Sequence, residues 1–155
     1  QVIHKQQFKA LSFQPGQWVD FYVPHLNKLT GYSITSIPAE LEEQQTLSLA
    51  VKQSEDLISK YVHSEQILQF EQKQIDIYLK VGGNLCFQSD QQKHYILVCG
   101  GIGITPLASI WKYYCKYCNK SRITLLYSVS TPTEFALLDE LQEYRKLAEK
   151  RSEIV

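Results

Sequence analysis

Apolar and polar residues alternate along several segments in the first half of the chain. These segments are residues 16–23 (GQWVDFYV), 46–52 (TLSLAVK) and 75–81 (IDIYLKV), and Pro15-Gly16 predicts a turn just before the first of them. A period of two residues indicates strands with one buried face, and such strands separated by polar loops predict a small antiparallel barrel or sandwich. The positions expected to face the core are Val19, Phe21, Val23, Leu47, Leu49, Val51, Ile75, Ile77, Leu79 and Val81.

The pattern changes at residues 88–94 (QSDQQKH), a polar stretch that predicts a domain boundary. Residues 95–99 (YILVC) then form a nearly continuous apolar run, which is typical of a strand covered on both faces. After it, Thr105 is expected to be the N-cap of a helix and Pro106 its first residue. The apolar residues at helical spacing that support this helix are Leu107, Ile110, Trp111, Tyr114 and Cys118.

A second strand and a second helix are expected next. Residues 122–129 (RITLLYSV) predict another buried strand, and Thr131 and Glu134 have the spacing of a capping box. The order strand, helix, strand, helix predicts a right-handed parallel α/β unit. The apolar face expected on the second helix consists of Leu137, Leu141, Tyr144 and Ala148.

The predicted fold class is an antiparallel β-barrel over residues 1–90, followed by a parallel α/β domain over residues 94–155. The second domain is expected to stop after two strands and two helices, which is half of a doubly wound sheet. Residues 151–155 (RSEIV) are then left without a partner strand. Since the chain also contains no methionine, we expect it to be a processed product or a piece of a longer protein.

The charge balance argues against some classes of partner. Lys and Arg together number 16, and Asp and Glu also number 16. This balance gives no support for nucleic-acid binding or for a strongly anionic membrane surface. No apolar run approaches the ~20 residues needed to span a membrane, and no targeting segment is visible.

The four cysteines are expected to be reduced thiols. Cys86 and Cys99 lie in apolar, strand-like surroundings and are predicted to be buried. Cys115 and Cys118 form one C-x-x-C at the end of a helix, with no second ligand pair at the spacing of a zinc site. We therefore expect helix packing for this pair, no metal, and a reducing intracellular setting.

A glycine-rich turn joins the first buried strand to its helix. Gly100, Gly101 and Gly103 let a ligand approach the backbone there, and the N-terminus of a helix favours an anion. The sequence is neither G-x-G-x-x-G, since Pro106 takes the place of the third glycine, nor a P-loop. The turn therefore predicts phosphate binding of another type, although a simple chain reversal also explains it.

The segment GGIGITP (residues 100–106) resembles the G-G-x-G-x-T-P motif of the ferredoxin–NADP reductase-like flavoproteins. GYSITSIP (31–38) is similar to the R-x-Y-S-x-x-S flavin motif of that family, and FQPGQWVDFYV, LSLAVK and VGGNLCF resemble its other segments. The resemblance covers residues 8–150. It implies a flavin-binding antiparallel barrel followed by a truncated nicotinamide-nucleotide domain, with FAD and NAD(P)H as cofactors.

The resemblance also implies roles for individual residues. Ser33 and Thr105 are the candidate catalytic residues, Ser33 near the flavin nitrogen that accepts hydride. Plainer explanations stay open: Tyr32 as a half-buried strand aromatic, Lys52 as a solvated strand lysine, and the hydroxyl residues as surface groups. The residues implied to contact flavin are Tyr32, Ser33, Thr35, Ala50, Val51, Lys52 and Ser59, and those implied to hold the nicotinamide nucleotide are Gly100, Gly101, Gly103, Ile104, Thr105 and Pro106.

Two positions depart from the flavin pattern. Thr30 stands where the family motif has an arginine that pairs with the flavin diphosphate, so weaker flavin binding is expected unless Lys28 or Lys60 substitutes. Asp56 stands where the family has glycine, before Ser59. This carboxylate repels a diphosphate unless it points away. Residues 56–65 (DLISKYVHSE) predict a short helix at this place.

The function implied is hydride transfer between a nicotinamide dinucleotide and FAD, with an unidentified electron acceptor. The alternatives are a nucleotide-binding or protein-interaction module that has lost turnover, and flavin-free nucleotide sensing. Glu134 and the absence of Lys and Arg in residues 128–135 lean toward NADH rather than NADPH. The family resemblance implies an intracellular, mitochondrial location.

Overall fold

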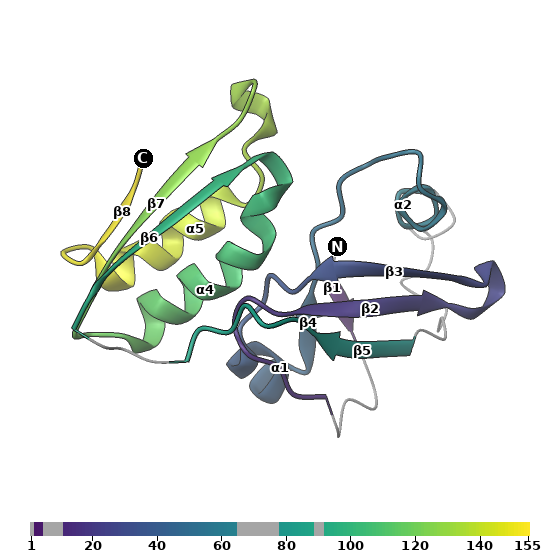
Figure 1. Cartoon of the computed structure of the whole chain (residues 1–155), viewed down its shortest axis with the longest axis horizontal. Helices are drawn as coiled ribbons and strands as arrows, with labels where there is room; N and C mark the ends of the chain where they lie inside the picture. Colours follow the sequence, from purple (N-terminus) through teal and green to yellow (C-terminus); the bar gives the residue numbers. More distant parts are fainter. Residues whose placement is uncertain (1, 5–10, 65–77, 89–91) are drawn as a thin grey trace.

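A computed structural model describes residues 2–4, 11–64, 78–88 and 92–155 of the chain. Figure 1 shows two groups of elements, one built from the first half of the chain and one from the second. The N-terminal elements are β1 (Val2–His4), β2 (Trp18–Val23), β3 (Lys28–Ser33), α1 (Pro38–Gln44), β4 (Thr46–Ser48), α2 (Leu57–Val62) and β5 (Tyr78–Gly82). The C-terminal elements are β6 (His94–Gly100), α4 (Ile104–Tyr117), β7 (Arg122–Ser128), α5 (Leu138–Arg145) and β8 (Ser152–Ile154).

The N-terminal strands form two antiparallel sheets. One has the order β3-β2-β5 and the other pairs β1 with β4. An isolated antiparallel bridge joins Ile34 to Leu49 between them. The described residues form no closed barrel, so the predicted barrel is present only as these antiparallel sheets.

Hydrogen bonds from Thr35 and Ser36 hold the end of β4 at Ser48. The Ser48 carbonyl accepts hydrogen bonds from the Thr35 backbone N–H at 2.9 Å and from the Thr35 hydroxyl at 3.0 Å. The Ser48 N–H donates to the Ser36 hydroxyl at 3.1 Å. These bonds join the end of β4 to the segment that follows β3.

The period of two residues predicted the N-terminal core well. Five of the expected inward positions (Val19, Phe21, Val23, Leu47 and Leu49) are buried in one cluster. Leu79 and Val81 pack against this cluster while half-buried, and Val51 is also half-buried. Ile75 and Ile77 lie outside the described residues.

The predicted turn at Pro15-Gly16 is confirmed and brings the two groups of elements into contact. Gly16 has φ +101°, and the Gln17 N–H donates to the Gln14 carbonyl across the turn at 3.1 Å. A Cβ at Gly16 would lie 2.5 Å from the Leu85 carbonyl oxygen and 3.1 Å from Cδ1 of Ile110 on α4. Glycine is required here both by the positive φ and by the close packing.

The C-terminal strands form a parallel sheet of order β6-β7-β8. Both helices lie on one side of this sheet (Figure 1). The prediction that residues 95–99 are covered on both faces is therefore wrong: Ile96 is 60% exposed and Val98 69% exposed. The reason is topological, because successive right-handed crossovers in one direction place their helices on the same face.

Residues 151–155 do have a partner strand, contrary to the prediction. β8 pairs in parallel with β7, with Ser152 opposite Ile123 and Ile154 opposite Leu125. Because α5 is short and is followed by a 3-10 turn (Lys146–Ala148), the last residues of the chain lie beside β7 and can pair with it. The C-terminal elements therefore comprise three strands rather than two.

Both helices begin at different residues from those predicted. The N-cap of α4 is Gly103, and the Thr105 hydroxyl instead donates back to the Ile102 carbonyl at 3.0 Å. Thr131 and Glu134 bond to each other at the start of a 3-10 turn (Pro132–Glu134), and α5 begins only at Leu138. Leu137, with φ +62°, separates the turn from the helix.

A buried lysine joins three helices. Lys112 on α4 is 1% exposed, and its Nζ lies 2.8 Å from Glu140 Oε1 on α5 and 3.6 Å from Glu40 Oε2 on α1. Tyr144 donates to the other oxygen of Glu40 at 2.9 Å, and burial and the Glu40 charge raise the pKa of this phenol. Nearby, the Ser109 hydroxyl donates to the Ser36 carbonyl at 2.7 Å. This cluster ties the C-terminal elements to α1.

The Lys112→Ala variant is expected to lower the free energy of unfolding by about 3 kcal/mol, because two carboxylates lose a buried partner. Urea unfolding followed by circular dichroism measures the change. The matched control is Lys146→Ala, which removes the exposed pair with Glu143 and is expected to cost less than about 1 kcal/mol. Equal effects of the two variants would contradict the structural role of Lys112.

The cysteines are only partly as predicted. Cys115 and Cys118 are buried, as expected for helix packing, but Cys86 and Cys99 are half-buried rather than buried. Burial raises the pKa of the Cys115 thiol to about 12. Neither a group of residues suited to a metal ion nor a helix long and apolar enough to cross a membrane occurs in the described parts of the chain.

The four thiols are expected to differ in reactivity. In the native protein at pH 8, iodoacetamide should modify Cys86 and Cys99 while Cys115 and Cys118 stay unmodified, because thiolate character and access control alkylation. Peptide mass spectrometry identifies the labelled positions, and labelling in urea provides the control in which all four react. Modification of Cys115 in the native state would contradict its burial.

Candidate functional site

The glycine turn lies at the carboxyl end of β6 and leads directly into α4. Gly101 begins a 3-10 turn (Gly101–Gly103), has φ +50°, and an added Cβ at this residue would meet no atom within 4 Å. The N-cap of α4, Gly103, makes no side-chain capping bond. The N-terminus of this 14-residue helix is therefore open toward a ligand, and its dipole favours an anion.

The other predicted nucleotide residues support the turn from inside. Ile104 is fully buried and belongs to the core beneath the turn. Thr105 is 6% exposed and its hydroxyl is directed to the Ile102 carbonyl, so its main visible role is to hold the turn. Pro106 is half-buried, whereas Gly100 and Gly103 are exposed. A phosphate at this turn would therefore contact the backbone of the glycines and not the side chain of Thr105.

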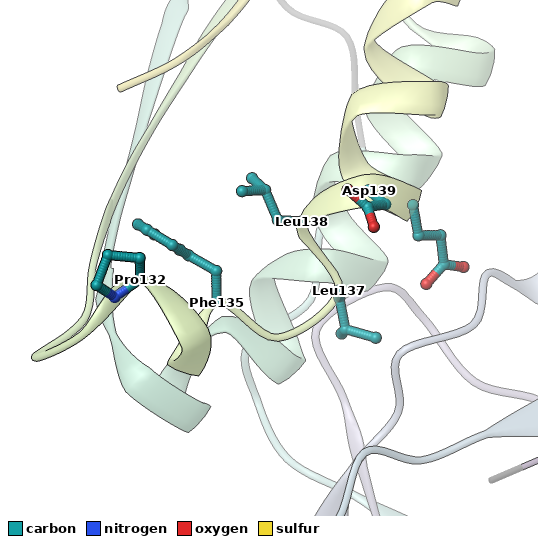
Figure 2. Close-up of a pocket in the computed structure, with 6 residues that line it drawn as sticks. Pro132, Phe135, Leu137, Leu138 and Asp139 are labelled. Atoms are coloured by element: carbon teal, nitrogen blue, oxygen red, sulfur yellow. The ribbon is translucent and has the colours of Figure 1, made fainter.

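A pocket lies beyond the neighbouring strand at the same edge of the sheet. β6 and β7 end level with each other, Gly100 opposite Ser128. The pocket has a volume of about 470 Å³. Figure 2 shows Pro132 and Phe135 on one side of it, with Leu138 and Asp139 across from them. The lining residues are Pro132, Phe135, Leu137, Leu138, Asp139 and Glu140.

Sequence reasoning missed this pocket because it treated residues 131–148 as one capped helix. The positive φ of Leu137 separates the 3-10 turn from α5 and opens the space between them. Phe135 packs edge-on against Tyr127 of β7 at 5.0 Å between ring centroids, which fixes one wall. No feature of the sequence marks Leu137 as a left-handed residue, since branched apolar side chains rarely adopt that conformation.

The two central flavin candidates leave β3 on opposite faces. Tyr32 pairs with Val19, faces the N-terminal core and packs edge-on against Phe21 at 5.8 Å between ring centroids. Ser33 pairs with Trp18 at the end of the strand. Both side chains are half-buried. They reach a common ligand only if it lies at the end of β3, beyond Ser33.

Some of the remaining residues predicted to contact flavin are accessible to solvent, and others are buried and hydrogen-bonded within the protein. Ala50 and Val51 are half-buried and Lys52 is exposed, so this stretch is accessible. Thr35 is 3% exposed, and its hydroxyl is bonded to the Ser48 carbonyl. The structure therefore directs Thr35 into the protein and not toward a cofactor.

The predicted short helix is confirmed as α2, and Asp56 is its N-cap. Oδ1 of Asp56 accepts hydrogen bonds from the backbone N–H groups of Ile58, at 2.9 Å, and Ser59, at 3.3 Å. Ser59 is 1% exposed; its hydroxyl accepts from the Ser54 N–H and donates to the Lys52 carbonyl, both at 2.9 Å. The N–H groups of Ile58 and Ser59 and the Ser59 hydroxyl thus already have partners within the chain.

Two of the nearby lysines are paired with carboxylates, whereas Lys52 is exposed. Lys28 Nζ lies 3.9 Å from Asp56 Oδ2, and Lys60 pairs with Glu55. Thr30, at the place of the motif arginine, is half-buried on β3. At the start of α2 an internal carboxylate thus takes the capping N–H groups, whereas the turn at α4 has no side-chain cap.

Comparison with known proteins shows what the chain is similar to. Residues 97–155 match the oxidoreductase NAD-binding domain. The chain is 35% identical over 108 residues to oxidoreductase NAD-binding domain-containing protein 1 of Bos taurus, covering 68% of this chain and 33% of that protein. The same protein of Pongo abelii is 32% identical over 150 residues, covering 86% of this chain and 47% of that protein. The chain thus spans a third to a half of these relatives.

Solved structures share the fold. Ferredoxin-NADP+ reductase from Plasmodium falciparum superposes with a TM-score of 0.70 at 21% identity, over 94% of this chain and 57% of that chain. The flavohem-like FAD/NAD binding domain of nitric oxide dioxygenase from Vibrio cholerae gives a TM-score of 0.71 at 22% identity, over 93% and 60%. The resemblance predicted from the motifs is confirmed: in sequence the chain resembles oxidoreductase NAD-binding domain-containing protein 1, and it has the fold of the ferredoxin–NADP reductase-like flavoproteins.

Proposed function

We propose that this chain binds a nicotinamide dinucleotide at the glycine turn and takes part in hydride transfer from it to a flavin. The observation that carries the proposal is the open, uncapped N-terminus of α4, reached through Gly101 directly after a parallel strand. Backbone N–H groups at such a helix start bind phosphate without needing a cationic side chain. The match of residues 97–155 to the oxidoreductase NAD-binding domain supports the same proposal.

The pocket beyond β7 supplies a place for the adenosine end of the dinucleotide. Pro132 and Phe135 offer apolar surfaces for a base, and Asp139 and Glu140 make the opposite side acidic. Residues 128–140 contain no Lys or Arg. A 2′-phosphate would find carboxylates and no cation there, so we propose that NADH is preferred over NADPH.

The chain's contribution is to bind and orient. The nicotinamide, when bound, supplies a hydride, and the protein's task is to align it with the acceptor. Buried Ile104 and the Thr105 hydroxyl hold the turn. The ion pair between Lys112 and Glu40 holds α4 against α1, the helix that follows β3 in the chain. Tyr32 and Ser33 at the end of β3 are proposed to meet the flavin ring.

A second candidate function is a nucleotide-binding module without turnover. The occupied α2 start and the absence of the motif arginine at Thr30 favour it. For the whole protein we propose a mitochondrial location and an electron acceptor that is a separate molecule.

The test combines nucleotide binding with anaerobic flavin reduction. We expect NADH to bind at least about tenfold more tightly than NADPH by isothermal titration. When the protein is mixed with NADH and free flavin under argon, the flavin absorbance should fall faster than in the same mixture without the protein. Binding of NADH without bleaching would support the module instead, and no NADH binding would refute both functions.

The Gly101→Val variant is expected to lose NADH binding by more than about tenfold. A side chain at φ +50° is strained and occupies the space that a phosphate would enter, whereas it touches nothing in the protein itself. Calorimetric titration measures the loss, and circular dichroism verifies the fold. The matched control is Gly31→Ala on β3, where an added Cβ makes ordinary contact with Trp18 at 3.5 Å, and NADH affinity should stay unchanged.

A further inference from the structure

One side chain of the C-terminal sheet holds the segment that joins the 3-10 turn (Pro132–Glu134) to α5. The Tyr127 hydroxyl accepts a hydrogen bond from the Ala136 N–H at 3.0 Å and donates one to the Ala136 carbonyl at 3.4 Å. Burial raises the pKa of this phenol, so it stays neutral and can make both bonds. The next residue, Leu137, has φ +62°. The two bonds thus fix the backbone immediately before the left-handed residue.

The ring of Tyr127 supports a wall of the pocket beyond β7. Phe135 packs edge-on against it, with 5.0 Å between the ring centroids and an interplanar angle of 82°. Phe135 is 36% exposed and lines the pocket (Figure 2), whereas Tyr127 is 5% exposed and is not among the lining residues. Tyr127 therefore acts on this pocket through Phe135 and the backbone of Ala136, and not by touching a ligand.

The shape of the pocket depends on the left-handed conformation of Leu137. Glycine and asparagine adopt that conformation readily, whereas a leucine in it is strained. Leu137 lines the pocket and is the N-cap of α5, and its carbonyl accepts from the Leu141 N–H at 2.9 Å. The Tyr127 hydroxyl thus stabilises a backbone conformation that leucine does not favour by itself.

Tyr127 is also firmly placed relative to the glycine turn. It stands opposite Cys99 in the parallel pairing of β6 and β7, and its N–H donates to the Val155 carbonyl at 3.0 Å. Cys99 lies beneath the turn, since a Cβ added at Gly103 would be 3.8 Å from the Cβ of Cys99. Tyr127 thus links the strand that leads into the glycine turn with the wall of the pocket.

We propose that Tyr127 is a positioning residue that sets the affinity for the adenosine half of the dinucleotide. Its hydroxyl and ring hold the pocket wall in place before the nucleotide arrives, so binding does not have to order this segment. The inference rests on the proposed function, in which the glycine turn takes phosphate and this pocket takes the adenosine. Loss of the hydroxyl should therefore weaken ligands that contain adenosine and spare those that lack it.

The experiment compares NADH with reduced nicotinamide mononucleotide, which lacks the adenosine. Both are titrated into the whole chain and followed by two-dimensional NMR, which also measures weak binding. Tyr127→Phe removes the hydroxyl and keeps the ring against Phe135. We expect NADH to bind this variant about fivefold more weakly, the effect of one lost hydrogen bond. The affinity for the mononucleotide should stay unchanged.

Tyr114→Phe is the matched control. It also removes a buried hydroxyl, which donates to the Ser121 carbonyl near the opposite end of α4 from the glycine turn. It should lower stability to a similar extent and leave both affinities unchanged. Adding Leu137→Asn to Tyr127→Phe should restore the NADH affinity to within about twofold of the unaltered chain, because asparagine adopts the left-handed conformation with less strain.

Three results would overturn the inference and leave the proposed function standing. They are an unchanged NADH affinity in Tyr127→Phe, an equal loss for both ligands in that variant, and a loss of NADH affinity that Leu137→Asn does not restore. If the unaltered chain does not bind NADH at all, the proposed function fails and the inference fails with it.

Discussion

The buried ammonium of Lys112 constrains the arrangement of the whole molecule. It lies between carboxylates of α1 and α5, and α4, which carries it, also carries the glycine turn at its N-terminus. A buried charge is tolerated only while it stays paired. A shift of α4 against α1 or α5 would therefore separate this charge from its partners.

The N-termini of α4 and α2 have the same backbone groups but differ in what caps them. At α4 the glycines leave the N–H groups and the dipole available for a ligand, and a core of buried residues such as Ile104 keeps the turn in shape. At α2 the Asp56 side chain provides the capping bonds itself. Folding stability gains from this cap, while the capacity to bind an external anion is lost. The starts of α4 and α2 thus differ in whether a side chain of the protein already caps them.

Much of the candidate site follows from local sequence. Glycines at 100, 101 and 103 between an apolar strand and a helical pattern indicate an open turn, since only the local backbone decides it. The roles of Thr105, Ser59 and Asp56 could not be assigned in this way. Each depends on which partner the side chain finds: the Ile102 carbonyl for Thr105, Lys52 and Ser54 for Ser59, and the α2 N–H groups for Asp56. The pocket at Phe135 likewise required the left-handed conformation of Leu137.

The sequence by itself determined the two types of sheet, the inward positions of β2 and the turn at Gly16, because periodicity and φ preferences are properties of short segments. Tertiary structure alone decided that Ile96 and Val98 are exposed and that β8 joins the sheet. These outcomes depend on contacts between segments far apart in the chain. Such contacts are set by crossover handedness, which a local pattern does not record.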